Sequence, residues 1–274
     1  MSKLSGKVAY VTGSGRGIGR AVALKLAREG ARLVINDLDS EPAAAVVAEI
    51  KALGGEAIAV PGSVTEAGFA EKFIQAGIAA FDGIDIIVNN AGYTWDALIG
   101  KMSDAQFDAM IDVHLKAPFQ ILRAASEPIR VRANKEAAEG REIFRKVVNI
   151  SSVAGTGGNI GQANYASAKS GVIGLTKTLS KEWGRFKVNV NAVAFGLIET
   201  RLTEASEVKK TIVVEGNEVA VGLPSKVVDS FRGMIPLGRA GTPEEAADGV
   251  YLFCCPESNY VSGQVLIVGG GLSF

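Results

Sequence analysis

Three side chains that together can move a proton, Ser152, Tyr165 and Lys169, lie within one short stretch, residues 151–169. Tyr165 and Lys169 are four positions apart, so a helix there would carry both on one face, one turn apart. An ammonium group beside a phenol favours the phenolate and lowers the tyrosine pKa from its usual value of about 10. Such a tyrosine can give a proton to a substrate oxygen or take one from it, and the Ser152 hydroxyl could hold the same oxygen. The stretch predicts interconversion of a carbonyl and an alcohol, which needs a hydride carrier.

A nucleotide-binding turn that would hold such a carrier is predicted near the start of the chain. An apolar run at 7–12 leads into a Gly-rich turn, an amphipathic helix at 20–29 and a second apolar run at 32–36. This order is that of a dinucleotide-binding fold, in which glycines let the backbone approach a pyrophosphate at a helix N-terminus. The glycine spacing, G-x3-G-x-G, differs from the usual G-x-G-x-x-G. The expected contacts are Gly13, Ser14, Arg16, Gly17, Ile18 and Gly19.

The choice of nucleotide depends on two side chains of opposite charge. Asp37 follows the second strand, where a carboxylate can accept both adenosine-ribose hydroxyls and would repel a 2′-phosphate. This position predicts NAD, although Asp37 could also be a solvated acid in a turn. Arg16 favours NADP instead, because a guanidinium in the turn could meet a 2′-phosphate. The other expected nucleotide contacts are Leu38, Ser63 and Val64 near the adenosine, and Asn90, Ala91 and Gly92 against a ribose.

Composition limits the class of protein. The chain has 274 residues, 47% of them hydrophobic, with no repeat or linker that divides it, so we predict one α/β domain over residues 1–274. The formal net charge is zero, which argues against nucleic acid or an anionic membrane as the main partner. The only cysteines, Cys254 and Cys255, are adjacent and not expected to pair. Without a long apolar run or a signal peptide, we expect a cytoplasmic protein, and we expect no metal site.

The remaining elements are predicted from periodicity and from turn residues. Residues 100–132 form one long or two shorter helices, which Pro118 should kink or interrupt. The charged segment 134–146 is either a solvated helix extension and loop or a basic surface for a phosphate-bearing acyl carrier. Residues 201–233 have weak periodicity and are predicted to form a mobile lid or substrate loop. The other predicted helices are 42–53, 65–81 with Thr65 as N-cap, 164–185, and one from Thr242-Pro243 to about Cys255; the other predicted strands are 57–60, 84–88, 147–151, 188–194 and 264–268.

These motifs together resemble the short-chain dehydrogenase/reductase family over nearly the whole chain. The resemblance is carried by Thr12-Gly13-x3-Gly17-Ile18-Gly19, Asn89-Asn90-Ala91-Gly92, Ser152, Tyr165-x3-Lys169 and the segment 196–200. It implies a Rossmann-type sheet of seven parallel strands with helices on both faces, a homotetramer, and hydride transfer between nicotinamide and a carbonyl carbon. It further implies that Tyr165 is the general acid/base and that Ser152 orients the substrate oxygen. Lys169 would hold the nicotinamide ribose and lower the tyrosine pKa, and Ile198 and Thr200 would contact the carboxamide.

The chain departs from the family pattern at three positions. His114 stands where the family usually has an Asn that keeps a helix bulge and a water in the proton relay. The histidine could hold the same water through a ring nitrogen or simply pack, and titration near neutral pH would add a pH dependence. Ser63 replaces the usual Asp after the third strand, so the adenine contact could fall to backbone groups. Phe195 replaces the usual Pro before Gly196 and is expected to reshape the nicotinamide or substrate pocket.

The resemblance also suggests a substrate class. Residues 158–165 look like the branch that reduces 3-oxoacyl thioesters of acyl carrier protein or CoA. Residues 113–115 are similar to the 3-hydroxyacyl-CoA dehydrogenase domains of multifunctional β-oxidation enzymes. We therefore favour 3-oxoacyl/3-hydroxyacyl thioesters of fatty acid metabolism, unless these segments are common to the family at large. The alternatives are a dehydrogenase of sugars, steroids or small secondary alcohols, and a non-catalytic nucleotide sensor, which the intact Ser152, Tyr165 and Lys169 disfavour.

Overall fold

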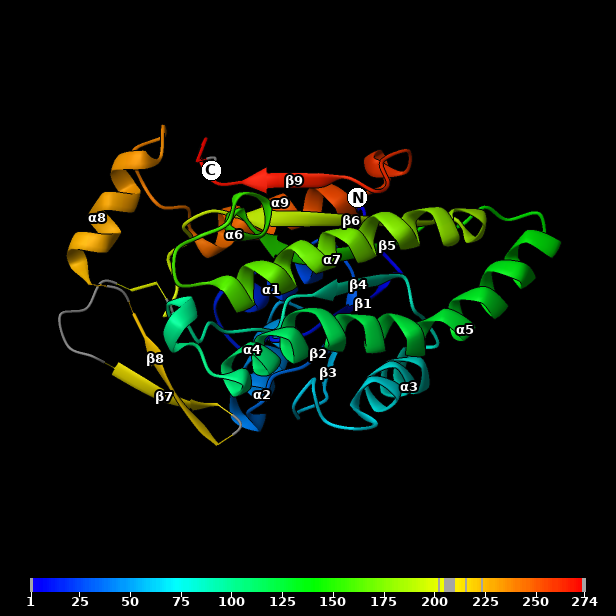
Figure 1. The fold of residues 1–274 in the computed structure, drawn as a ribbon. Helices are drawn as coiled ribbons and strands as arrows, with labels where there is room; N and C mark the ends of the chain where they lie inside the picture. Colours follow the sequence, from blue (N-terminus) through cyan, green and yellow to red (C-terminus); the bar gives the residue numbers. More distant parts are fainter. Residues whose placement is uncertain (1, 202, 205–209, 215, 223, 273–274) are drawn as a thin grey trace.

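A parallel sheet of seven strands forms the centre of the chain in a computed structural model (Figure 1). The structure describes residues 2–272 except 202, 205–209, 215 and 223. The strand order β3-β2-β1-β4-β5-β6-β9 changes direction between β1 and β4, and it confirms the predicted seven-stranded parallel sheet. The strands are β1 (Val8–Val11), β2 (Arg32–Ile35), β3 (Ala57–Ala59), β4 (Ile86–Asn89), β5 (Arg145–Ser152), β6 (Val188–Phe195) and β9 (Val265–Val268).

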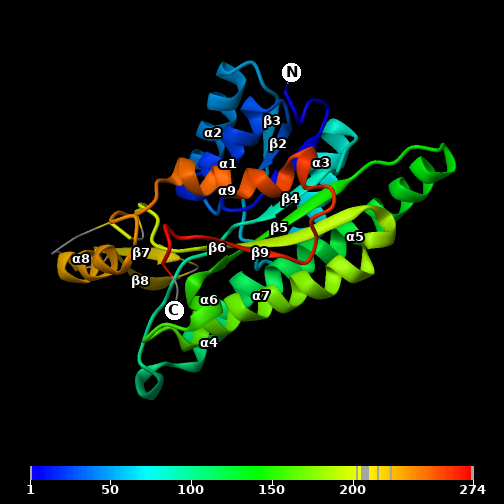
Figure 2. The same cartoon turned by 90° about the horizontal axis from the view of Figure 1, so that it is seen from above.

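Helices cover both faces of the sheet, as Figure 2 shows. One core cluster joins the sheet to α1 (Gly17–Arg28), α2 (Ser40–Ala52) and α9 (Pro243–Cys254). The second cluster joins it to α3 (Phe69–Phe81), α4 (Asp104–Ile111), α5 (Ala117–Ala138) and α7 (Ala163–Glu182). The short helices are α6 (Val153–Gly157), η1 (Ile99–Lys101), η3 (Gly184–Phe186) and η4 (Pro256–Ser258).

The central strands β1 and β4 are buried on both faces, which explains their almost continuously apolar sequences. In β1, Val8 and Tyr10 belong to the cluster on the α3–α7 side, whereas Ala9 and Val11 belong to the cluster on the α1 side. Successive side chains of a strand point to opposite faces, so this strand supplies both cores. Parallel strands bring their carboxyl ends to one end of the sheet, where open α/β sheets bind ligands.

The predicted helix 65–81 begins later than expected, at Phe69. Thr65 is not its N-cap, because the cap position is Gly68 in a left-handed conformation with φ of 80°. The backbone N–H of Thr65 instead donates to the hydroxyl of Ser63 at 3.1 Å. This local bond holds residues 63–65 in a turn and delays the helix.

The helical segment 100–132 is interrupted just before Pro118, as predicted. The interruption is a π-helical turn, η2 (Asp112–Lys116), between α4 and α5. Pro118 lies in the first turn of α5 and has no N–H to donate to the carbonyl of His114, four residues earlier in this turn. Isolated π-turns occur mostly as bulges in helices at functional sites, and this one carries His114.

Residues 201–233 contain regular structure that the sequence analysis missed. The described parts include an antiparallel hairpin, β7 (Lys210–Val214) with β8 (Asn217–Val221), and helix α8 (Ser225–Met234). Part of the predicted loop lies outside the described residues. The weak periodicity of 201–233 therefore did not reveal the hairpin and the helix, and the role of this segment as a mobile lid or substrate loop stays a prediction. The side chains of Ile212 and Val219 pack with the cluster on the α3–α7 side.

The charged segment 134–146 is a solvated extension of α5 and a loop over most of its length, as one of the two predictions has it, but its last two residues are buried. Strand β5 begins at Arg145, two residues earlier than expected, and Arg145 and Lys146 are buried. The guanidinium of Arg145 pairs with Glu136 at 2.6 Å, and Lys146 Nζ donates to Asn189 Oδ1 at 2.9 Å. This segment lies at the amino end of β5, roughly 20–25 Å along the strand from its carboxyl end.

The predicted start of the last helix is confirmed. Thr242 caps α9 through a bond from the backbone N–H of Glu245, the Glu245 side chain accepts from the Thr242 N–H, and Pro243 occupies the first turn. The adjacent Cys254 and Cys255 are buried and unpaired, as expected.

Candidate active site

Ser152 is the last residue of β5 and lies beside Phe195, the last residue of β6, in the register of the two strands. The sheet thus delivers the serine to the carboxyl ends of its strands. Its Oγ caps α6 by accepting from the N–H of Ala154 at 3.2 Å and lies 3.4 Å from the carbonyl oxygen of Phe195. A hydrogen bond with Ser152 also lowers the pKa of Tyr165.

Tyr165 and Lys169 both lie on α7, as their spacing predicts. Nζ of Lys169 lies 5.6 Å from the centre of the Tyr165 ring. The same Nζ donates to the carbonyl oxygen of Ile150 on β5 at 2.7 Å, which orients the lysine toward the sheet. The structure therefore brings Ser152, Tyr165 and Lys169 together from β5 and α7.

The direction of the tyrosine pKa shift differs from the prediction. Burial raises the pKa of Tyr165 to about 12 and outweighs the hydrogen bond from Ser152. Burial also lowers the pKa of Lys169 to about 7. The spacing of the two residues indicates only the attraction between their charges, whereas the folded chain adds the cost of placing each charge inside the protein. In the nucleotide-free protein the tyrosine is thus held as a phenol.

The neighbouring serine, Ser151, has a structural role. Its hydroxyl is buried and donates to the backbone carbonyl of Lys169 at 2.8 Å. Gly155 on α6 approaches the same residue so closely that a Cβ built there would lie 2.7 Å from the Lys169 carbonyl carbon. These contacts hold α7 against β5 and α6, and they leave Ser152 as the serine that faces Tyr165.

His114 lies in the π-turn and contacts the same tyrosine. The rings of His114 and Tyr165 are perpendicular, at 88°, with centres 4.9 Å apart. Nε2 lies 2.6 Å from the carbonyl oxygen of Tyr93, and the ring is buried. Burial and the positive charge of Lys169 hold the pKa of His114 well below its usual range. The pH dependence that titration near neutral pH would add is therefore not expected from this histidine.

The Gly-rich turn has the geometry that a dinucleotide requires. A Cβ built on Gly13 would lie 2.7 Å from Cα of Ala91, and one on Gly19 would lie 2.1 Å from the carbonyl oxygen of Gly13. Only glycines permit this packing of the turn against the end of β4. Helix α1 begins at Gly17, and its N-cap, Arg16, makes no side-chain cap bond. The first N–H groups and the positive end of the helix dipole are thus available to a pyrophosphate.

The other side chains of the turn stabilise it from within. The hydroxyl of the buried Ser14 donates to the carbonyl of Val11 at 2.8 Å. The side-chain amide of Asn90 donates to the carbonyl oxygens of Thr12 and Gly13, both at 3.0 Å. These two hydrogen bonds hold the turn against the end of β4. Ile18, the second residue of α1, packs partly buried against the core cluster on the α1 side.

Asp37 occupies the end of β2 and supports the Gly-rich turn. Its Oδ2 accepts from the backbone N–H of Gly15 at 3.0 Å, and the residue is 8% exposed, so it is not a freely solvated acid. The guanidinium of Arg16 pairs with Asp39 at 2.9 Å and lies 3.8 Å from Asp37 Oδ1. Asp37 and Arg16, which predict different nucleotides, are thus neighbours.

The remaining predicted nucleotide contacts lie around this turn. Leu38 is exposed, Ser63 Oγ lies 2.8 Å from Thr65 Oγ1, and Val64 is buried. Gly92 packs so closely against His114 that a Cβ built on the glycine would lie 2.0 Å from Cε1 of the ring. Phe195 is buried in the cluster on the α1 side, so its ring packs in the core.

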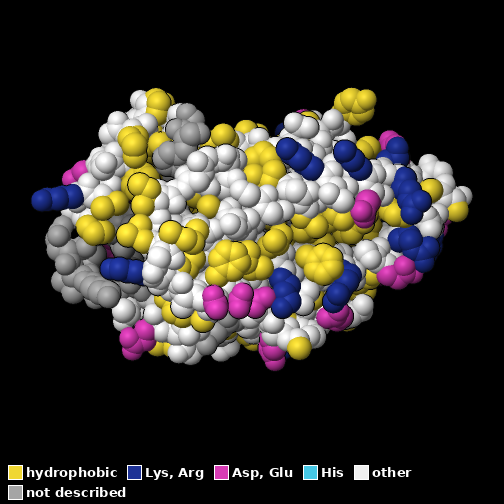
Figure 3. Space-filling model, in the orientation of Figure 1, with side chains coloured by type: hydrophobic (Ala, Val, Ile, Leu, Met, Phe, Trp, Pro, Cys, Tyr) yellow, Lys and Arg dark blue, Asp and Glu magenta, His cyan; other side chains and the backbone are white. Residues whose placement is uncertain are grey.

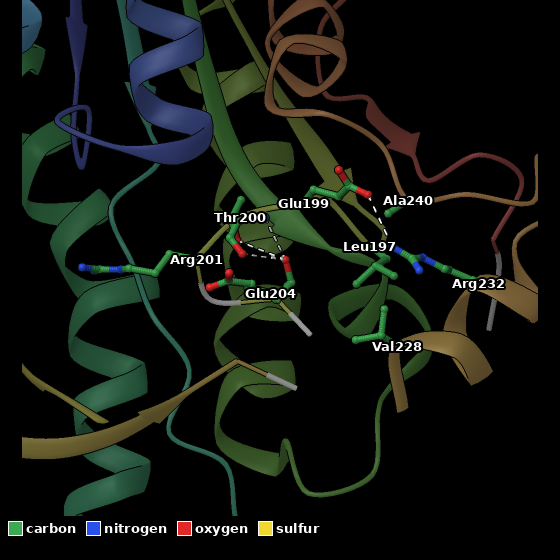
Figure 4. A pocket seen from close by; sticks show the side chains of 9 residues that line it. Leu197, Glu199, Thr200, Arg201, Glu204, Val228, Arg232 and Ala240 are labelled. Carbon is green, nitrogen blue, oxygen red and sulfur yellow. Dashed lines mark hydrogen bonds and ion pairs between the residues drawn. The ribbon is translucent and has the colours of Figure 1, made fainter. Parts of the chain in front are cut away.

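A pocket of about 370 Å³ opens beyond β6 (Figure 4). Its wall includes Thr200, and a Cβ built on Gly17 would lie 3.7 Å from Cγ2 of Thr200, which places the pocket beside the Gly-rich turn. Ile198 is buried below it. Figure 4 shows Arg232 turned toward Glu199, 3.6 Å away. The pocket is lined by Leu197, Glu199, Thr200, Arg201, Thr203, Glu204, Val228, Arg232 and Ala240.

Sequence reasoning missed two hydrogen bonds that join the loop after β4 to the start of α7. Gln162 Nε2 donates to the carboxylate of Asp96 at 2.8 Å, and Asn164 Nδ2 donates to the carbonyl of Trp95 at 3.1 Å. The negative charge of Asp96 also raises the pKa of Tyr165. No motif marks these residues, although Gln162 and Asn164 lie directly before the tyrosine in the segment 158–165.

The described residues contain no group of three or more His, Cys, Asp or Glu side chains arranged to hold a metal ion. None of the helices in that part of the chain combines the length and the hydropathy that a membrane span needs.

Comparison with known proteins gives consistent similarities. The family model for short chain dehydrogenases matches residues 7–211. A 3-oxoacyl-(acyl-carrier-protein) reductase of Synechocystis sp. is 42% identical over 274 residues, 99% of each chain. The reductase of the same name from Thermotoga maritima is 37% identical over 270 residues, 98% of this chain and 99% of that protein. A (3R)-3-hydroxyacyl-CoA dehydrogenase of Canis lupus familiaris is 35% identical over 278 residues, 98% of this chain and 97% of that protein.

Proposed function

This chain belongs to the short-chain dehydrogenase family, and from that premise we propose that it interconverts 3-oxoacyl and 3-hydroxyacyl thioesters. It is an oxidoreductase that acts on a CH–OH group with NAD(P). The observation that carries the proposal is the meeting of Ser152, Tyr165 and Lys169 at the carboxyl ends of the strands. The thioester class is supported by the names of relatives that align over nearly their full length.

In this proposal Tyr165 is the general acid/base and Ser152 orients the substrate oxygen. During reduction the phenol of Tyr165 gives its proton to the oxygen that gains negative charge, while the Ser152 hydroxyl donates a hydrogen bond to it. During oxidation the same proton returns to Tyr165. The raised pKa of Tyr165, about 12, keeps the phenol protonated for the first of these roles.

Lys169 has two tasks in the proposal, to hold the nicotinamide ribose and to stabilise negative charge on Tyr165. Its Nζ is fixed by the carbonyl of Ile150 at 2.7 Å, which leaves further N–H donors of the ammonium for a ligand. The bound nicotinamide nucleotide supplies or accepts the hydride. We expect its binding to favour the charged ammonium, whose pKa burial alone lowers to about 7.

The residues proposed to bind the nucleotide are those of the Gly-rich turn and its surroundings. We propose NAD as the preferred form, because Asp37 lies at the end of β2 and disfavours a 2′-phosphate. Arg16 is the residue that would accept that phosphate, but its guanidinium pairs with Asp39 at 2.9 Å. NADP use would require Arg16 to leave this pair. Ile198 and Thr200 are proposed to contact the carboxamide.

We propose that four copies of this chain assemble into a homotetramer. Figure 3 shows hydrophobic side chains gathered over the face that α4, α5 and α7 present in Figure 1. Among the exposed residues there are Phe107 on α4, and Phe119 and Val131 on α5. Exposed apolar surface of this kind is typical of an interface. Light scattering coupled to size-exclusion chromatography measures the mass directly.

A substrate panel tests the proposed function. Initial rates are measured with acetoacetyl-CoA and acetoacetyl-acyl-carrier protein against a panel of sugars, steroids and small secondary alcohols, each with both nucleotides. We expect kcat/KM for a thioester to exceed that for every other substrate. Turnover of an alcohol of the panel without turnover of any acyl thioester would contradict the proposal, and nucleotide binding without any turnover would indicate a sensor.

A further inference from the structure

The residue directly before Tyr165 is a buried asparagine. Asn164 is 0% exposed, and its side chain bonds to three backbone groups. Nδ2 donates to the carbonyl oxygen of Trp95 at 3.1 Å and to that of Gln106 at 2.9 Å. Oδ1 accepts from the backbone N–H of Tyr165 at 2.8 Å. Because the two carbonyl groups only accept and the N–H only donates, the amide has one orientation in which all three bonds form.

The bond to Tyr165 replaces a cap that the start of α7 lacks. The N-cap residue, Gln162, makes no side-chain bond to the helix, and its side-chain amide donates instead to Asp96 at 2.8 Å. Tyr165 is the third residue of α7, and the first N–H groups of a helix have no partner within it. Asn164 supplies an acceptor to one of these groups, the N–H of the tyrosine itself.

The same side chain joins α7 to two other elements. Trp95 lies in the loop after β4, and Gln106 lies in α4. The bond from Gln162 to Asp96 also joins this loop to α7, but it is exposed, so water competes for its partners. The amide of Asn164 is shielded from water, and breaking its bonds would leave buried polar groups unpaired. Asn164 is therefore the stronger of the two links.

Lys169, one turn further along α7, is fixed independently of Asn164. Its backbone carbonyl accepts from the hydroxyl of Ser151 at 2.8 Å, and its Nζ donates to the carbonyl of Ile150 at 2.7 Å. Both partners lie on β5. Loss of the Asn164 side chain would therefore release the first turn of α7, which carries Tyr165, and leave Lys169 held against the sheet.

Resting on the function proposed above, we propose that Asn164 is a positioning residue for Tyr165, which holds the first turn of α7 against α4 and the loop after β4 during proton transfer. All its hydrogen bonds go to backbone groups, so it acts through the tyrosine and not on the substrate. It sets where the phenol of Tyr165 lies relative to Ser152. A misplacement of about 1 Å can lower the rate of an enzyme about 100-fold.

A second buried asparagine provides the matched control. Asn191 on β6 is also 0% exposed, its Nδ2 donates to the carbonyl of Val261 at 2.9 Å, and its Oδ1 accepts from the N–H of Gln264 at 3.0 Å. It lies four residues before Phe195, about 13 Å along the strand from the active-site end. Its substitution therefore removes buried hydrogen bonds without touching the first turn of α7.

The variants Asn164→Ala and Asn191→Ala separate positioning from stability. We expect both to lower the urea concentration at the midpoint of unfolding, because both leave buried backbone groups unpaired. Only N164A should lower kcat, by at least about tenfold, with nucleotide Kd changed less than about threefold because Lys169 stays in place. A kcat of N164A equal to that of N191A would overturn the proposal.

The variant Asn164→Asp separates the acceptor of the amide from its donors. The carboxyl group keeps an oxygen for the N–H of Tyr165 and loses the two donors to Trp95 and Gln106. Burial beside two carbonyl oxygens raises the pKa of the introduced acid, so at pH 6 it is protonated and can donate one hydrogen bond. We expect kcat of N164D at pH 6 to exceed that of N164A at least about threefold. A value at or below that of N164A would overturn the proposal.

Hydrogen exchange of the wild-type protein requires neither a variant nor a substrate. We expect the backbone N–H of Tyr165 to exchange at least about 100-fold more slowly than an unprotected amide, because Asn164 holds it. Exchange at the rate of an unprotected amide would overturn the proposal. Inactivity of the wild-type protein toward every substrate would contradict only the proposed function, since this measurement does not depend on turnover.

Discussion

The imidazole of His114 and the phenol of Tyr165 are perpendicular, at 88°, with ring centres 4.9 Å apart. The two residues are far apart in sequence and come from different elements, the π-turn η2 and the first turn of α7. On the same tyrosine, Lys169 Nζ lies 5.6 Å from the ring centre and Ser152 contributes a hydrogen bond. Tyr165 is therefore surrounded by Ser152, Lys169 and His114, and this environment determines how readily its phenol gives up or takes a proton.

The two adjacent serines should differ in their effect on catalysis. We expect Ser152→Ala to lower kcat about 100-fold, because it removes the hydrogen bond to the substrate oxygen, and to lower the free energy of unfolding by about 1 kcal/mol through the lost cap of α6. Ser151→Ala removes the hydrogen bond from the serine to the carbonyl of Lys169 and should lower the free energy of unfolding by about 0.5–1.5 kcal/mol while keeping most of kcat. Steady-state kinetics and urea unfolding of both variants test this pair, and the opposite pattern would assign catalysis to Ser151.

Asp37 should determine the preference between the two nucleotides. Wild-type kcat/KM should be higher with NADH than with NADPH. Asp37→Ser removes the charge that repels a 2′-phosphate, so we expect the NADPH/NADH ratio of kcat/KM to rise at least about tenfold. Asp39→Ser is the matched comparison: it frees Arg16 from its ion pair and leaves Asp37 in place, so we expect a smaller rise in the ratio. A wild-type preference for NADPH would mean that Arg16 outweighs Asp37.

Asp96 should discriminate against anionic substrates. Its negative charge acts on Tyr165 and would act equally on an anionic group bound there. We expect Asp96→Asn to raise kcat/KM for acetoacetate, a free acid, about fivefold relative to a neutral thioester such as acetoacetyl-N-acetylcysteamine. Asp96→Glu keeps the charge and serves as the control. An equal change for both substrates would exclude this electrostatic role.

The pH dependence should differ between the two directions of the reaction. Oxidation needs the phenolate of Tyr165, whose pKa is raised to about 12, so its kcat should increase with pH from 7 to about 10. Reduction needs the phenol and should not show this increase. The sign follows from burial, which favours the neutral phenol in the folded protein up to its raised pKa. An oxidation rate that falls over this range would contradict the assignment.

Much of the fold was predictable because its signals are local. The buried strands are continuous apolar runs, and Thr242 with Pro243 marks a helix start by its own chemistry. The hairpin at 210–221 was missed, although a valine-rich run on each side of Glu215-Gly216 is a hairpin signal. The late start of α3 depends on one side-chain bond, from the Thr65 N–H to Ser63, that competes with the helix.

The site was predictable in its members but not in its electrostatics. Spacing alone placed Tyr165 and Lys169 on one face of a helix. The raised pKa of Tyr165 and the lowered pKa of Lys169 depend on burial, which comes from elements distant in sequence. The neutrality of His114 likewise depends on Tyr93 and Lys169, which only the folded chain brings to it. Asp96 was missed for the same reason.

The central claim, that Tyr165 transfers the proton to and from a 3-oxoacyl thioester, is tested most directly by one comparison. Nucleotide oxidation with acetoacetyl-CoA is measured for the wild-type protein and for Tyr165→Phe, together with nucleotide Kd by fluorescence titration. We expect Tyr165→Phe to lower kcat about 100-fold or more and to change the nucleotide Kd less than about threefold. Turnover by Tyr165→Phe at the wild-type rate would contradict it.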